Sequence, residues 1–279
     1  MNTEVHTPES TNSEPKVIHA SEQGHWYWPD GRPAYEVPGA NGQMVKPDIR
    51  HARKLGLSRG VTDIIRMKAA PNLEAYKQEQ ILTAALTLTR EPNEPDKSFI
   101  ARIKADAKAH AELRALEGKK VHEAIERCLS GKPYDHKYQE HVSRVVHELD
   151  ELHGPFIGDF KTKETLLDKN GKELPDKALF FDNHVMQLAA YREGLAYTLY
   201  ESNKHYVCET SFSCSKRFGG RVDVHTSILP YGCPLVSIMI GIKPAMVRVR
   251  TWSEKEAQRG WKMFEHCLEL WKLENRIEP

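Results

Sequence analysis

The sequence contains no run of about 18 or more apolar residues, the minimum length for a helix that crosses a bilayer. Its first residues, MNTEVHTPESTNSEP, also lack the basic start and apolar stretch of a secretory signal. We therefore expect a cytoplasmic protein with no membrane partner.

Cysteine is scarce, and the chain contains no CxxC pair and no internal repeat. Scattered single cysteines in odd number are typical of reduced thiols, and they argue against both a disulfide framework and a zinc ribbon. The five are Cys128, Cys208, Cys214, Cys233 and Cys267.

A strong excess of either charge is missing too, since 40 Lys and Arg residues face 39 Asp and Glu residues. This balance excludes a globally basic nucleic-acid binder, although it allows a local basic groove. Any polyanionic partner must therefore be bound by a local cluster of basic residues.

The length of 279 residues is enough for a sizeable core in a single large domain. Residues 1–24 are polar and predict a flexible tail. We expect one domain over 25–279, mainly helical over 25–152 and α/β over 153–279, so the fold class is α/β (α+β).

Hydrophobic periodicity and turn signals predict the individual elements. Residues 25–42 indicate a β-ribbon whose aromatic side chains either pack on a core or stack on bases. The predicted helices are 72–89, 97–113, 115–129, 137–152, 184–202 and 253–275, the last opened by a capping box of Ser253 and Glu256. The predicted strands are 156–163, 206–214, 219–228, 233–242 and 245–252.

The strand predicted at FIGDFKTK carries Asp159 and Lys161 two positions apart. On a strand such residues project from the same face, about 6 to 7 Å apart. A carboxylate can hold a divalent cation, and a neighbouring lysine can orient water and offset negative charge during phosphodiester hydrolysis. An ordinary solvated ion pair would have the same sequence pattern.

Other polar residues add to this candidate site. Asp223 follows two glycines in RFGGRVDVH, where a ligand could approach closely or the chain could simply bend, and Glu209 could supply a further oxygen. Gln187 and Tyr191 share one helical face. His122 lies among apolar residues, a setting equally typical of a core histidine.

Taken together, these segments resemble the RecB-like branch of the PD-(D/E)XK nuclease superfamily, especially the exonucleases of phages and prophages. The resemblance spans about residues 26–275. It rests on four motifs, GKKVHEAIE, GDFKTK, QLAAYREGL and GGRVDVH. Residues 55–80 are also similar to the N-terminal region of those proteins, and the closing helix is similar to their closing segment.

The resemblance implies a restriction-endonuclease-like core, a mixed central sheet flanked by helices, with an N-terminal helical elaboration. It implies Mg²⁺- or Mn²⁺-dependent hydrolysis of linear single- or double-stranded DNA, and a recombination protein as partner, in a bacterial or phage-infected cell. His122, Asp159, Asp223 and Glu209 would be metal ligands. Lys161 would be the catalytic lysine, and Gln187 and Tyr191 would contact the active site or the DNA backbone.

The motif order departs from the family, because GGRVDVH follows the D-x-K strand and the QLxxY helix instead of preceding them. Either this strand is transposed and still reaches the site, or an acidic residue before Asp159 replaces Asp223: Glu148, Asp150 or Glu151. The departure also leaves an alternative function, an inactive DNA-end-binding or recombination accessory protein.

Two further features bear on binding. Basic residues near the motifs could contact phosphates, or form an ordinary charged surface: Lys216, Arg217, Arg221, Arg248 and Arg250. Some relatives hold an iron–sulfur cluster on four cysteines, but the cysteine positions here differ, which favours reduced thiols.

Overall fold

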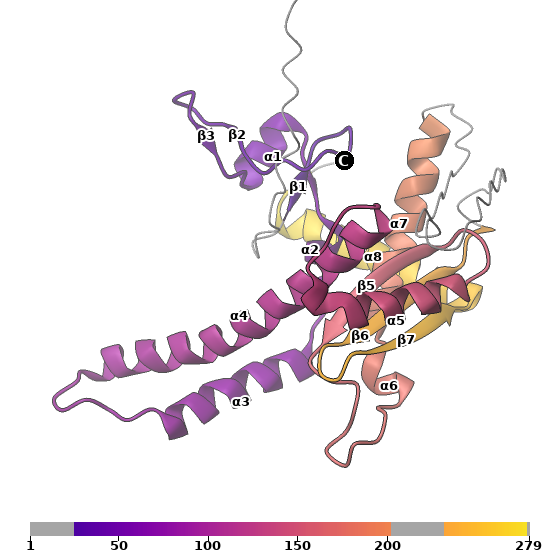
Figure 1. The fold of residues 1–279 in the computed structure, drawn as a ribbon. Coiled ribbons are helices and arrows are strands. Elements are labelled where there is room, and N and C mark those ends of the chain that lie inside the picture. The colour runs from indigo at the N-terminus through magenta and orange to yellow at the C-terminus, as the bar shows by residue number, and fades with distance from the viewer. Residues whose placement is uncertain (1–24, 202–231, 278–279) are drawn as a thin grey trace, which may run out of the picture. The chain divides into compact units, whose positions relative to one another are not determined.

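The computed structural model of the protein describes residues 25–201 and 232–277 (Figure 1). The chain divides into two compact units, one ending at Gly60 and the other starting at Val61. The sequence predicts one domain over 25–279, with a mainly helical part that ends near residue 152. The segments predicted as a tail and as strands 206–214 and 219–228 lie outside the described residues.

The first unit is built from short elements. They are β1 (Trp26–Tyr27), β2 (Val37–Pro38), β3 (Met44–Val45), α1 (Ile49–Leu55) and β4 (Ser58–Arg59). The expected ribbon is split, because β1 pairs with β4 and β2 pairs with β3, both antiparallel. Trp26 is buried, and the Arg59 guanidinium lies 4.7 Å from the centre of its ring. This tryptophan therefore serves packing.

The second unit is mixed α+β, which confirms the coarse fold class. Its helices are α2 (Val61–Ile65), α3 (Pro71–Thr87), α4 (Asp96–Leu129), η1 (His136–Tyr138), α5 (Gln139–Asp150), α6 (Asp176–Leu179), α7 (Asp182–Glu201) and α8 (Glu254–Glu274). Its strands are β5 (Ile157–Lys163), β6 (Leu235–Gly241) and β7 (Met246–Trp252). None of the described helices is both long and apolar enough to cross a membrane.

The prediction of two helices over 97–129 is wrong, since α4 is one helix of 34 residues. Gly118, near the expected break, does not end it. A Cβ at Gly118 would lie 2.5 Å from Thr162 Oγ1 on β5, so the missing side chain lets the helix approach the strand closely. The N-terminal half of α4 packs on α3 through Ala84, Ile103 and Ala107 (Figure 1).

The three strands form one sheet in the order β5-β6-β7. β6 is parallel to β5 and antiparallel to β7. The parallel pair requires a crossover connection, and α6 and α7 lie within it. β6 is buried along its whole length, as its continuous apolar sequence LVSIMIG predicts for a central strand. β5 forms an edge of the sheet within the described part of the chain.

Helices cover both faces of this sheet. α4 and α5 pack on one face, where Val236, Ile238 and Ile240 meet Val121, Ile125 and other apolar residues. α7 and α8 cover the other face, where Leu235, Met239 and Trp252 form a second core cluster with residues of both helices. Because side chains alternate along β5, Asp159 and Lys161 lie on the α7 side of the sheet.

The closing helix α8 begins as predicted. The Ser253 hydroxyl accepts a hydrogen bond from the Glu256 backbone N–H, and the Glu256 carboxylate accepts one from the Ser253 N–H. The capping box therefore satisfies two donors at the start of the helix and confirms the prediction for this end.

Candidate functional site

The site begins with the D-x-K pair on β5. Lys161 Nζ lies 2.8 Å from Asp159 Oδ2, and the two side chains are 30% and 14% exposed. This ion pair is partly covered yet still reachable from solvent. Asp159 Oδ2 itself is buried and has no aligned hydrogen bond among the described residues, so it keeps lone pairs free for another partner.

Gln187 joins α7 to this pair. Lys161 Nζ donates to Gln187 Oε1 at 2.8 Å, while Gln187 Nε2 donates to Asp159 Oδ1 at 3.4 Å and to the Tyr191 hydroxyl at 2.6 Å. The amide oxygen thus faces the Lys161 ammonium, and the amide nitrogen faces the Asp159 carboxylate and the Tyr191 hydroxyl. This orientation matches the acceptor and donor ends of a glutamine amide. Since Gln187 is only 7% exposed, its contacts fix the pair from a buried position.

Tyr191 lies one turn after Gln187, on the same helical face, and its side chain is 39% exposed. Its hydroxyl accepts a hydrogen bond from the buried amide. The sequence prediction that Gln187 and Tyr191 act from one face of a helix is confirmed for their position.

His122 reaches the same region from α4. Burial lowers the pKa of this histidine below its usual value; the nearby Asp159 carboxylate opposes that shift and the Lys161 ammonium adds to it. The imidazole is therefore neutral at pH 7, and its buried Nε2 has no hydrogen-bond partner in the described structure. A neutral imidazole nitrogen without a partner retains a lone pair or an N–H for a ligand.

His184, which the sequence reasoning missed, also borders the site. Burial, with a further effect of the Lys161 ammonium, lowers its pKa to about 4. The spacing could have revealed it, because His184, Gln187 and Tyr191 stand at i, i+3 and i+7 and so share one face of α7. The residue type by itself does not mark His184 as part of the site, so this helical spacing is the feature of the sequence that indicates it.

The remaining predicted residues divide into two groups. Glu209, Lys216, Arg217, Arg221 and Asp223 lie outside the described residues. On β7, Arg248 pairs with Glu173 and Asp176, and Arg250 pairs with Glu256 while its guanidinium lies 4.1 Å from the centre of the Trp252 ring. Both arginines are thus engaged with the protein itself, and a role in binding phosphate stays a prediction.

The acidic residues considered as replacements for Asp223 lie at the end of α5 and just after it. In the described structure, Glu148, Asp150 and Glu151 form no hydrogen bond or ion pair with Asp159 or Lys161. The choice between these residues and Asp223 as the first acidic ligand stays a prediction.

The donor set is compatible with part of a divalent metal site. Asp159 supplies carboxylate oxygen, which Mg²⁺ and Mn²⁺ both accept, and His122 supplies an imidazole nitrogen that suits Mn²⁺ better. No group of three or more His, Cys, Asp and Glu side chains that could hold a metal occurs within residues 25–201 and 232–277. Water and phosphate oxygens complete many Mg²⁺ sites, and Glu209 and Asp223 stay predicted ligands.

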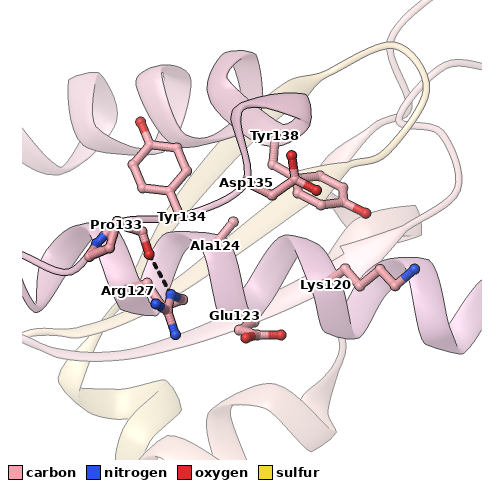
Figure 2. Close-up of a pocket in the computed structure, with 8 residues that line it drawn as sticks. All are labelled: Lys120, Glu123, Ala124, Arg127, Pro133, Tyr134, Asp135 and Tyr138. Carbon is pink, nitrogen blue, oxygen red and sulfur yellow. Dashed lines mark hydrogen bonds between the residues drawn. The ribbon is translucent and has the colours of Figure 1, made fainter.

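A separate hollow of about 450 Å³ lies between α4 and the segment before α5 (Figure 2). Lys120, which lines the hollow, lies on α4 two positions before His122. This spacing places the two side chains about 160° apart around the helix axis. The hollow is thus on another side of α4 from the D-x-K site. Its lining consists of Lys120, Glu123, Ala124, Arg127, Pro133, Tyr134, Asp135 and Tyr138.

Comparison of the chain with protein-family models, with curated proteins and with solved structures finds no match. The residues of the site and their arrangement are therefore the basis on which a function can be inferred.

Proposed function

We propose that this protein is a metal-dependent DNA nuclease with a PD-(D/E)XK core, acting as an exonuclease on linear DNA in phage recombination or DNA processing. The observation that carries the proposal is the Gln187 amide, which contacts both Asp159 and Lys161 from another element. A chance D-x-K pair on a solvated strand would not need a buried glutamine on a helix to orient both of its charges.

In this function Asp159, His122 and the predicted ligands Asp223 and Glu209 would hold Mg²⁺ or Mn²⁺. The bound cation would polarise the scissile phosphate and lower the pKa of water. Gln187 keeps the Lys161 ammonium on the α7 side of β5, where it can orient the attacking water and offset the negative charge that develops on phosphate. Tyr191 holds the amide in the required orientation.

The partial burial of Asp159 and His122 affects the charges that the site presents. Asp159 is mostly covered and its neighbour His122 is neutral, so the charges that face the substrate are those of Asp159 and Lys161. Low local dielectric strengthens their interaction with a phosphate or a cation relative to that in water.

The test is cleavage of end-labelled linear single- and double-stranded DNA and of a covalently closed circle, with Mg²⁺, Mn²⁺ or EDTA. The parent protein is expected to degrade the linear substrates only with metal. Lys161→Ala and Asp159→Asn should each lower the rate at least about 100-fold, since each removes a group that acts on the transition state. Lys262→Ala, an exposed lysine on α8, is the matched control.

The Asp223→Ala variant separates the two sources of the first ligand. Loss of cleavage would support Asp223, and retained cleavage would point to the acidic residues before Asp159. An inactive parent that still binds DNA ends would support the accessory-protein function instead.

A further inference from the structure

Phe181, the residue directly before α7, has a different environment from its neighbour. Phe180 is buried in the core cluster beneath α7, whereas the Phe181 side chain is 48% exposed. The burial of Phe180 anchors the chain at this point, because it fixes the backbone from which Phe181 extends. An exposed aromatic ring thus stands at a fixed position at the start of the helix that carries Gln187.

His184 holds this ring from one side. The two ring centres are 5.7 Å apart with an angle of 71° between the planes, an edge-to-face contact of the favourable kind. The His184 backbone N–H also donates to the Phe181 carbonyl at 2.9 Å. The backbone bond fixes the main chain at Phe181 and the ring contact favours one orientation of its side chain, which lowers the entropy lost on binding.

The aromatic pair borders the D-x-K site through His184. This histidine shares a face of α7 with Gln187, whose amide accepts from Lys161, and the Lys161 charge contributes to its lowered pKa of about 4. His184 is therefore an uncharged ring at pH 7. Its buried Nδ1 has no hydrogen-bond partner among the described residues, as in sites completed by a ligand or a water.

We propose that Phe181 and His184 form a stacking subsite that holds an unpaired nucleobase of the substrate strand beside Asp159 and Lys161. This rests on the proposed function and adds a property of its substrate, namely that the strand at the site is single. A nucleotide joins a flat π ring to an anionic phosphate. Here a half-exposed aromatic ring contacts a histidine on the helical face from which Gln187 binds the Lys161 ammonium. A base inside a duplex offers only its edges, so its face is free to stack only after the strands separate.

Binding is measured by fluorescence anisotropy with a labelled single-stranded oligonucleotide and the full chain in EDTA, where no cleavage occurs. Phe181→Ala should weaken binding by about 5- to 150-fold, the range for loss of one base–aromatic stack. Phe181→Trp should keep parent-like affinity. Leu270→Ala, which removes an apolar side chain 44% exposed on α8, should have no effect.

An oligonucleotide of abasic residues supplies the second measurement. The parent should bind the abasic strand more weakly than it binds the normal oligonucleotide. On the abasic strand, the parent and Phe181→Ala should have the same affinity. Parent-like affinity of a folded Phe181→Ala variant for the normal oligonucleotide would overturn the subsite, as would an equal loss with the abasic strand. Absence of any DNA binding by the parent would overturn both the subsite and the proposed function.

The two proposals fail in different ways. Metal-dependent cleavage with no effect of Phe181→Ala on binding would leave the nuclease function standing without this subsite. A parent that never cleaves, but whose binding depends on Phe181 and on the base, would keep the subsite in a DNA-binding protein.

Discussion

Gln187 is the residue on which the geometry of the site depends most. Its amide is the one described group that contacts Asp159, Lys161 and Tyr191. Without it the ammonium would lose one of the two partners that it has among the described residues and could turn toward solvent, because a lysine side chain has many rotamers. A small change in orientation at a reacting centre lowers the rate much more than it lowers affinity.

Gln187→Leu should therefore lower kcat by about 10- to 100-fold with little change in KM. Tyr191→Phe removes only the hydroxyl that accepts from the amide, so its effect should be smaller. Steady-state cleavage of linear DNA measures both variants. A kcat for Gln187→Leu within about twofold of the parent value would exclude the positioning role assigned here.

His184 predicts a pH dependence of stability. Its pKa is about 4 in the folded protein and near 6.5 when unfolded, so between these values the unfolded chain binds a proton that the native state does not. The stability associated with this group is complete above pH 6.5 and is lost as the pH falls toward 4.

Urea unfolding in EDTA at pH 7.5 and pH 5 measures this loss. His184 should account for about 2 kcal/mol of the decrease between the two pH values. In His184→Leu the decrease in the free energy of unfolding should be smaller by that amount. His153 is an exposed histidine, so His153→Leu should behave like the parent. Equal decreases in the parent and in His184→Leu would show that His184 is not buried as a neutral ring.

At the scale of elements, the approach of α4 to β5 positions His122. Gly118 lies one helical turn before His122 and against Thr162, and a Cβ at that position would lie 2.5 Å from Thr162 Oγ1. The helix can therefore approach the strand only where a side chain is absent. This contact brings a histidine from one helix layer to the edge of the strand that carries Asp159.

Gly118→Ala should destabilise the protein by about 1 to 3 kcal/mol, because overpacking outweighs the gain in helix propensity. Thr162→Ala removes the obstructing atom, so the double variant should recover most of that loss. Chemical denaturation of the four proteins in the cycle measures the coupling. Additive effects of the two substitutions would show that the two residues do not oppose one another.

At the scale of the whole molecule, a bound cation would stabilise the folded state. A ligand that binds only the native protein adds about 2.7 kcal/mol at 100 times its Kd. Mg²⁺ or Mn²⁺ should therefore raise the Tm of the parent and leave Asp159→Asn nearly unchanged. NaCl of matched ionic strength is the control, and equal shifts in parent and variant would argue against a metal at this site.

Binding of a highly charged substrate by a nearly neutral chain also needs local charge. Arg248 and Arg250 already form ion pairs with carboxylates of the same protein. Their use by DNA would thus require exchange of these partners, as would that of Lys161, which pairs with Asp159. Salt-dependent affinity would reflect the local cations and not the net charge.

The sequence by itself determined the elements around the site. Alternation and apolar content fixed β5, β6 and β7, because these properties depend on local side-chain chemistry. Capping residues likewise fixed the start of α8. The same local pattern placed Gln187 and Tyr191 on a shared face, but it wrongly divided α4 near residue 114. The structure has one helix there, and its Gly118 lies against a distant strand.

Only the tertiary structure decided which of these residues meet. Asp159 and Gln187 are 28 positions apart, and His122 precedes both on a separate helix. Parallel pairing of β5 with β6 and the packing of α7 on the sheet bring the amide to the carboxylate, while the close approach of α4 brings the histidine. Such long-range contacts follow from packing and crossover topology, which local periodicity does not encode. The spacing of His184 along α7 is visible in the sequence, but its burial and its position near Lys161 arise only when α7 packs on β5.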